Sequence, residues 1–181
     1  DVGHRWGEGP PLFERVSADL GRGDVVALTG PSGSGKSTLL SLIAGWLAPA
    51  WGRVERTDIG RTHWVFQNPY GQPRRTTRDH VSYPFIARGI PRPEADRRAD
   101  KLLERFGLPS RGDQPFADLS GGEAQRLMLA RAVAVQPRLL LVGEPTAQLD
   151  RASARTVNAV LAGLADAGAI VLVASHDSDT I

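Results

Sequence analysis

After a short apolar run, Val25-Val26-Ala27-Leu28, the sequence reads Gly30-Pro31-Ser32-Gly33-Ser34-Gly35-Lys36-Ser37. Apolar residues then recur at helical spacing from Leu39 to Leu47, and Pro49 ends that pattern. A strand, a glycine-rich loop and a helix in this order are typical of the start of an α/β domain with a mostly parallel sheet. We therefore predict this fold class for the chain.

The glycine-rich loop fits the pattern G-x-x-x-x-G-K-[ST], which binds the phosphates of a nucleoside triphosphate. Its glycines let backbone N–H groups turn toward a phosphate chain, and the positive end of the following helix faces the same point. The Lys36 ammonium can contact the β- and γ-phosphates, and the Ser37 hydroxyl can ligate Mg²⁺. The predicted nucleotide-binding residues of the loop are Gly30, Pro31, Ser32, Gly33, Ser34, Gly35, Lys36, Ser37 and Thr38.

The composition limits the other classes of function. The 181 residues are enough for one domain, and the absence of cysteine excludes a disulfide scaffold, a zinc site with cysteine ligands and thiol catalysis. No apolar run is long enough to span a bilayer. The net charge is only +2, and the arginine clusters at 74–78 and 92–98 lack interleaved aromatic residues. They fit solvated faces better than a nucleic-acid surface, so we expect no nucleic-acid partner.

The rest of the chain alternates between strand and helix patterns, as a parallel sheet requires. Strands are predicted at 62–66, 139–142 and 169–174, and helices at 94–106, 123–135 and 152–165. Residues 70–93 are rich in Pro, Arg and Gly, and their pattern predicts no element.

Four further segments carry a resemblance to one family. The stretch Leu119-Ser120-Gly121-Gly122-Glu123-Ala124-Gln125 resembles the signature motif of ATP-binding-cassette (ABC) ATPases, and Gln67 resembles their Q-loop glutamine. Residues 139–146 and the following Leu149-Asp150 are similar to Walker B and the D-loop, and His176 is similar to the switch histidine. The order of these motifs from Trp6 to His176 is similar to that of an ABC nucleotide-binding domain.

The resemblance implies an architecture and a set of ligands. It implies a P-loop NTPase fold with a mostly parallel central sheet, a small antiparallel N-terminal β part and a helical signature subdomain at about residues 69–136. Residues 1–181 would be a single ABC domain, which looks clipped at both ends relative to the family. The implied ligands are ATP and Mg²⁺, enclosed by a head-to-tail homodimer or heterodimer of such domains.

Nucleotide-binding roles follow from the matching positions. Trp6 stands where the family usually has an aromatic residue that stacks on adenine, although an aromatic residue at a loop edge can also be purely structural. Ser120, Gly121 and Gly122 begin a helix whose N–H groups would face the γ-phosphate bound by the other subunit. Asp150 lies in the D-loop segment and is assigned to the same nucleotide site.

Catalytic roles follow in the same way. Glu144 resembles the general base that polarises the attacking water. Gln67 would contact Mg²⁺ and relay to a partner, and His176 would hydrogen-bond the γ-phosphate. The predicted catalytic residues are thus Lys36, Gln67, Glu144 and His176, and the predicted metal ligands are Ser37 and Gln67.

The sequence departs from the family at Gly143. Walker B of the family ends in Asp-Glu, whereas this chain reads Val142-Gly143-Glu144. The missing carboxylate normally anchors the hydration shell of Mg²⁺, so we expect hydrolysis to be slowed more than ATP binding. A naturally degenerate site and an introduced substitution are both compatible with this residue.

The resemblance also implies a partner and a location. The chain would be a transport motor at the cytoplasmic face of the cell membrane, docked through residues 68–90 on a permease carried by another chain. Residues 83–91 and 99–108 resemble the lipoprotein-release and macrolide-export branch. The alternative is a degenerate or soluble ABC protein that binds ATP as a regulatory or assembly module without transport.

Overall fold

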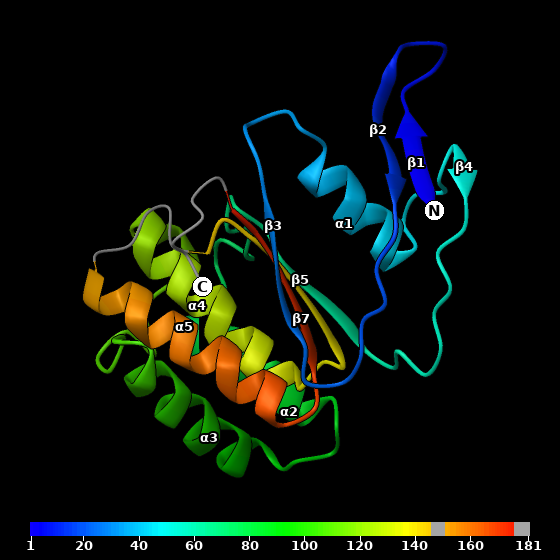
Figure 1. Ribbon diagram of the computed structural model, residues 1–181. Helices are drawn as coiled ribbons and strands as arrows, with labels where there is room; N and C mark the ends of the chain where they lie inside the picture. The colour runs from blue at the N-terminus through cyan, green and yellow to red at the C-terminus, as the bar shows by residue number, and fades with distance from the viewer. Residues whose placement is uncertain (146–150, 176–181) are drawn as a thin grey trace.

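The structure is a computed structural model that describes residues 1–145 and 151–175. A four-stranded parallel sheet lies at its centre, in the order β3-β7-β6-β5 (Figure 1). These strands are β3 (Val25–Thr29), β5 (Thr62–Val65), β6 (Leu139–Gly143) and β7 (Ile170–Ser175). The parallel sheet confirms the predicted α/β class.

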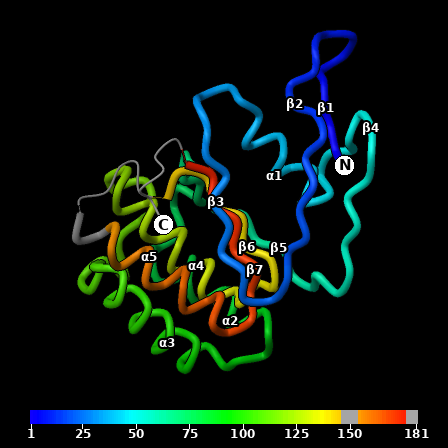
Figure 2. The backbone as a smooth tube through the Cα atoms, in the orientation of Figure 1, coloured from blue at the N-terminus to red at the C-terminus, as the bar shows by residue number. Residues whose placement is uncertain are grey.

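A second, antiparallel sheet has the order β2-β1-β4. It consists of β1 (Val2–Arg5), β2 (Pro11–Val16) and the short β4 (Trp51–Gly52). Figure 2 shows it apart from the central sheet, on the side of α1 (Lys36–Ala44). The small antiparallel part that the resemblance implies is therefore present.

Helices cover both faces of the central sheet (Figure 1). Helix α1 packs against one face, and α4 (Gly121–Val135) and α5 (Arg151–Asp166) pack against the other. The helices α2 (Thr77–Ile86) and α3 (Arg92–Arg105) lie outside α4, and a short 3-10 helix, η1 (Phe116–Asp118), precedes α4. Among the residues described, no helix is long and apolar enough to cross a membrane.

The alternation of side chains in β6 explains why this strand is apolar throughout. Leu139 and Leu141 pack with Leu40 of α1, whereas Leu140 and Val142 belong to the larger cluster on the α4 and α5 side. Successive strand side chains point to opposite faces, so a strand covered on both faces needs apolar residues at every position.

Two predictions about the helices were wrong. The first helix ends at Ala44 rather than Leu47, because Gly45 has a left-handed φ of 80° and its N–H donates to the Leu42 carbonyl at 3.1 Å. Helix α2 occupies part of the segment in which the pattern predicted no element. The Thr76 side chain caps α2 by accepting the Asp79 N–H at 3.1 Å. The buried face of α2 includes the polar His80, so the sequence does not show apolar residues at regular helical spacing there.

The arginine clusters are not simply solvated faces. Arg78 pairs with Asp100 and Asp113, and its shortest contact to Asp100 is 2.7 Å. Arg92 pairs with Asp79 at 2.5 Å, which again joins α2 to α3. The pairs of Arg78 with Asp100 and of Arg92 with Asp79 join the two outer helices at their surface, over the apolar contacts between them.

Candidate active site

The loop between β3 and α1 has a backbone that only glycine adopts easily. Gly30 and Gly35 have φ angles of 152° and 93°. A Cβ at Gly30 would lie 2.9 Å from Ser34 Oγ, and one at Gly35 would lie 2.8 Å from the Phe13 ring. Both the left-handed backbone and the close packing therefore explain the two glycines.

Lys36 and the start of α1 place positive charge at this loop. The Lys36 Nζ donates to the Gly30 carbonyl at 2.7 Å and to the Pro31 carbonyl at 3.0 Å. An ammonium carries three donors, and these two bonds use two of them. Helix α1 follows Gly35 without a side-chain cap, so its first N–H groups can serve an anion.

A groove of about 1030 Å³ opens beside the loop. It brings together residues that are far apart in the sequence but were assigned to one nucleotide site. These are Trp6, Ser32, Gly33, Gly35, Lys36, Ser37, Thr38, Gln67 and Glu144, and Gly143 lines the same groove. Gly30, Pro31 and Ser34 belong to the same loop but do not line the groove.

The carboxyl end of β6 also lines the groove. Glu144 has a φ of 48°, and its N–H donates to the Ala174 carbonyl of β7 at 2.8 Å. A Cβ at Gly143 would lie 3.3 Å from the backbone nitrogen of Gln67. The Q-loop residue thus packs closely against the end of β6, in the same groove as Lys36. A non-glycine residue held at positive φ is a feature that concentrates at functional sites.

Trp6 lies at the rim of the groove, with 59% of its surface exposed. Its ring meets the buried His4 edge-on, with ring centroids 4.7 Å apart. An exposed indole beside the loop can stack on a base.

The sequence reasoning missed the aromatic residues that line the groove. Trp64 and Phe66 stack with centroids 5.0 Å apart, and Trp46 stacks on Trp64 at the same distance. Tyr70 lines the groove further along the same segment. Trp64 and Phe66 are two residues apart along one extended segment, and this spacing places both rings on the same face.

The signature residues lie outside the groove. Ser120 caps α4 by accepting the Glu123 N–H at 3.3 Å, while the Glu123 carboxylate accepts the Ser120 N–H at 2.9 Å and the Ser120 hydroxyl at 2.8 Å. The two bonds that the carboxylate accepts lower the pKa of Glu123, and Arg111 makes a smaller contribution in the same direction. Gly121 and Gly122 form the first turn of α4. The groove of one chain thus does not contain the predicted signature contacts. Asp150 and His176 fall outside the residues that the structure describes.

The groove offers oxygen ligands of the kind that Mg²⁺ prefers. The Ser37 hydroxyl and the Gln67 amide both line it, and Mg²⁺ commonly uses one or two protein oxygens together with phosphates and water. Within residues 1–145 and 151–175, no group of three His, Cys, Asp or Glu side chains could hold a metal alone. The donor set fits an ion that arrives with nucleotide phosphates.

Comparison with known proteins places these features in a family. The family described as "ABC transporter" matches residues 13–147. An energy-coupling factor transporter ATP-binding protein of Lacticaseibacillus paracasei is 39% identical, covering 91% of this chain and 64% of the relative. A lipoprotein-releasing system ATP-binding protein of Rhodopseudomonas palustris is 36% identical, covering 93% and 82%. These two belong to different transport systems, so the comparisons do not select one branch.

This chain spans only about half the length of some of its relatives. An uncharacterized ABC transporter ATP-binding protein of Mycobacterium tuberculosis is 37% identical over 90% of this chain, which spans 54% of the relative's length. Among solved structures, a dimeric ATP-binding cassette in a post-hydrolysis state with ADP and Pi has a TM-score of 0.84 and 28% identity, covering 99% of this chain and 87% of that one.

The sequence match covers most of the chain, and the structural match extends over almost all of it. The chain belongs to the ABC transporter family, as an ATP-binding domain with a P-loop NTPase fold.

Proposed function

We propose that this chain binds and hydrolyses ATP as the motor domain of an ABC transporter and drives a permease carried by a separate chain. The observation that supports it best is the single groove in which Lys36, Ser37, Gln67 and Glu144 meet. A phosphate chain in the glycine-rich loop lies against backbone N–H groups, the start of α1 and the Lys36 ammonium.

Glu144, Ser37 and Gln67 are assigned different roles in hydrolysis. The Glu144 carboxylate accepts a proton from the attacking water as the water oxygen bonds to the γ-phosphorus, while the bond from that phosphorus to the bridging oxygen breaks and ADP leaves. Ser37 and Gln67 would hold Mg²⁺, which neutralises developing charge on the phosphates when it is bound. Gly143 provides no carboxylate for that ion, so we infer that hydrolysis is slow relative to ATP binding.

A second copy, identical or related, would complete the site. Ser120, Gly121 and Gly122 lie outside the groove of their own chain, at the N-terminus of α4. In a head-to-tail dimer this positive helix end would face the γ-phosphate held by the partner. Asp150 and His176 are proposed to join the same site.

The permease is proposed to dock on residues 68–90, which would hold the chain at the cytoplasmic face of the membrane. Tyr70 and Tyr83 are 75% and 55% exposed, whereas Phe85 is 7% exposed and belongs to the core. The docking surface is therefore expected to use the exposed tyrosines, and a variant at Phe85 would test folding instead.

ATP binding tests the proposal directly, and the two lysines supply matched variants. A fluorescent ATP analogue should bind the chain, and Lys36→Ala should weaken it by at least about tenfold because a charge-assisted contact to phosphate is lost. Lys101→Ala removes an exposed lysine of α3 and should leave affinity within about twofold. Equal binding by both variants would contradict the site. ATP binding without hydrolysis, even with the permease present, would favour a regulatory module.

A further inference from the structure

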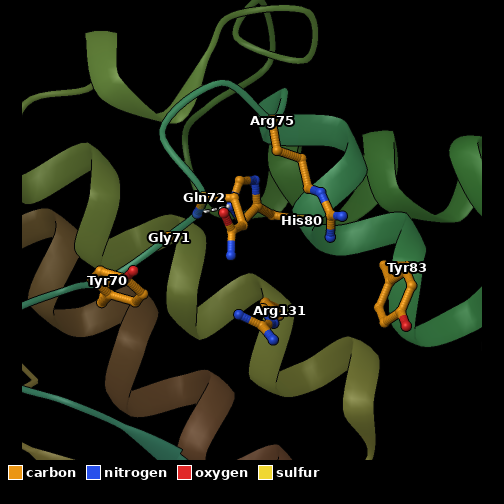
Figure 3. Close-up of a pocket in the computed structure, with 7 residues that line it drawn as sticks. All are labelled: Tyr70, Gly71, Gln72, Arg75, His80, Tyr83 and Arg131. Carbon is orange, nitrogen blue, oxygen red and sulfur yellow. Dashed lines mark hydrogen bonds between the residues drawn. The ribbon is translucent and has the colours of Figure 1, made fainter.

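A second, smaller pocket of about 280 Å³ lies between the 70–75 segment and the helices α2 and α4. Figure 3 shows the Arg75 side chain extending from that segment toward the side where Arg131 of α4 and Tyr83 of α2 lie. The remaining lining residues are Tyr70, Gly71, Gln72 and His80. The pocket is too small for a nucleotide, but it can hold the end of a side chain.

Two arginines give this pocket an unbalanced positive charge. Burial lowers the pKa of Arg131, and the charge of nearby Arg75 lowers it further. Arg75 lies over the Tyr83 ring, with its guanidinium carbon 5.4 Å from the ring centroid. Within the described residues, neither arginine makes an ion pair with a carboxylate. Two guanidinium groups facing one cavity without a counter-charge are a site for an anion.

His80 fixes the wall of the pocket without competing for that anion. Its Nδ1 donates to the Thr76 carbonyl at 2.8 Å. Its Nε2 accepts the Gln72 N–H at 3.0 Å, the bond dashed in Figure 3. Both bonds together require the neutral ring. Burial lowers the pKa of His80, and Arg131 and Arg75 lower it further against the opposing effects of Thr76 and Asp79. The imidazole therefore ties the 70–75 segment to α2 as an uncharged group.

The surroundings indicate that the anion is part of a protein. Tyr70 and Tyr83 line the pocket and are 75% and 55% exposed, and aromatic residues of this kind are enriched in protein interfaces. Tyr70 lines both this pocket and the nucleotide groove. A ligand in the pocket would therefore contact the same chain segment, three residues after Gln67, that also contributes to the groove.

We propose that this pocket receives the carboxylate of a Glu or Asp side chain from the docking segment of the membrane subunit, with Arg75 and Arg131 as its two partners. This inference rests on the docking on residues 68–90 proposed above. A carboxylate can accept two parallel N–H bonds from a guanidinium, which would fix the register of the docked segment.

The first experiment uses acetate and inorganic phosphate as separate probes of the full chain. Acetate should shift the NMR signals of the Arg75 and Arg131 Nε–H groups, and Arg75→Gln should remove the shift at Arg131. Phosphate binding that is at least about tenfold tighter than acetate, or no shift with either probe, would overturn the carboxylate assignment.

The second experiment first identifies a permease by its copurification with the chain and by its stimulation of ATP hydrolysis. Arg75→Glu should weaken permease binding at least about tenfold, because it places a carboxylate against a carboxylate. The matched variant Arg105→Glu alters an exposed arginine of α3 outside residues 68–90 and outside the pocket, and its permease binding should stay within about twofold of the unmodified chain. Unchanged melting temperatures check the fold of both variants. A Glu→Arg or Asp→Arg change in the docking segment should restore binding to Arg75→Glu.

The outcomes separate the two proposals. Wild-type binding by Arg75→Glu would overturn the pocket assignment and leave the transport function standing. If no permease binds or stimulates the unmodified chain, the proposed transport function fails, and the pocket assignment fails with it.

Discussion

Gly143 ends β6 at the point where a carboxylate would reach the nucleotide groove. Its φ lies outside the left-handed region, so an aspartate can adopt the same backbone. The new Cβ would lie 3.3 Å from the Gln67 nitrogen, and Gln67 would have to move by a few tenths of an ångström. We expect Gly143→Asp to raise Mg²⁺-dependent hydrolysis at least about tenfold and to change ATP affinity less than about threefold, as measured by phosphate release and analogue binding.

Gly143→Asn is the matched control for this change. It has almost the same size as aspartate and makes the same demand on Gln67, but it carries no charge. If asparagine raises the rate as much as aspartate, the effect comes from packing and the metal explanation is wrong. An unchanged hydrolysis rate in Gly143→Asp with intact ATP binding would also contradict the metal explanation.

Single residues of the site differed in how well the sequence predicted them. Gly30 and Lys36 were predictable because the backbone and charge demands of phosphate binding leave few alternatives at these positions. The stack of Trp46 on Trp64 was not predictable, because it joins the residues just after α1 to β5 through a tertiary contact that no local spacing encodes. That Arg75 and Arg131 line one pocket was missed for the same reason.

Helix α4 begins at a capping box whose loss can be separated from the loss of nucleotide contacts. Ser120→Ala removes the side-chain acceptor of the Glu123 N–H and should cost about 1 kcal/mol of unfolding free energy. Ser120→Asp keeps an acceptor for the Glu123 N–H but places its carboxylate beside that of Glu123, so its unfolding free energy should also fall by about 1 kcal/mol, which makes Ser120→Ala its control of similar stability. Urea unfolding followed by circular dichroism measures both values.

The same two variants test the role proposed for the signature helix. Ser120→Asp places a negative charge where the partner's γ-phosphate would lie, so ATP-dependent dimerisation should fall at least about tenfold despite the preserved fold. Light scattering with and without ATP measures the dimer. A dimer of normal strength in Ser120→Asp would show that this helix end does not face the nucleotide.

The helices show where sequence patterns succeed and fail. Helix α5 has a clear apolar face, and its prediction at 152–165 nearly coincides with Arg151–Asp166. Helix α2 was missed because His80 and Ser82 lie on its buried side and Pro84 lies inside it. Both polar residues can be buried only because the folded molecule surrounds them, which a local pattern does not reveal.

The stability of the whole molecule should depend on pH through His63 in β5. Burial and the charge of Arg131 lower the pKa of His63 from 6.5 to about 4. The unfolded chain therefore binds an extra proton between these values, and the stability present above pH 6.5 is lost as the pH falls toward 4. Between about pH 7.5 and 5, this histidine should account for about 2 kcal/mol of lost unfolding free energy.

Urea unfolding at several pH values tests this dependence, with His63→Gln as the variant that cannot titrate. The unmodified chain should lose about 2 kcal/mol more than His63→Gln on acidification, whatever the stability of the variant at neutral pH. The depressed pKa of His80 adds a loss in the same direction, which both proteins share and which therefore cancels in the comparison. Parallel pH profiles for the two proteins would mean that His63 does not remain neutral in the fold. Since Arg131 faces both His63 and the small pocket, a carboxylate bound beside it should shift the His63 transition toward higher pH.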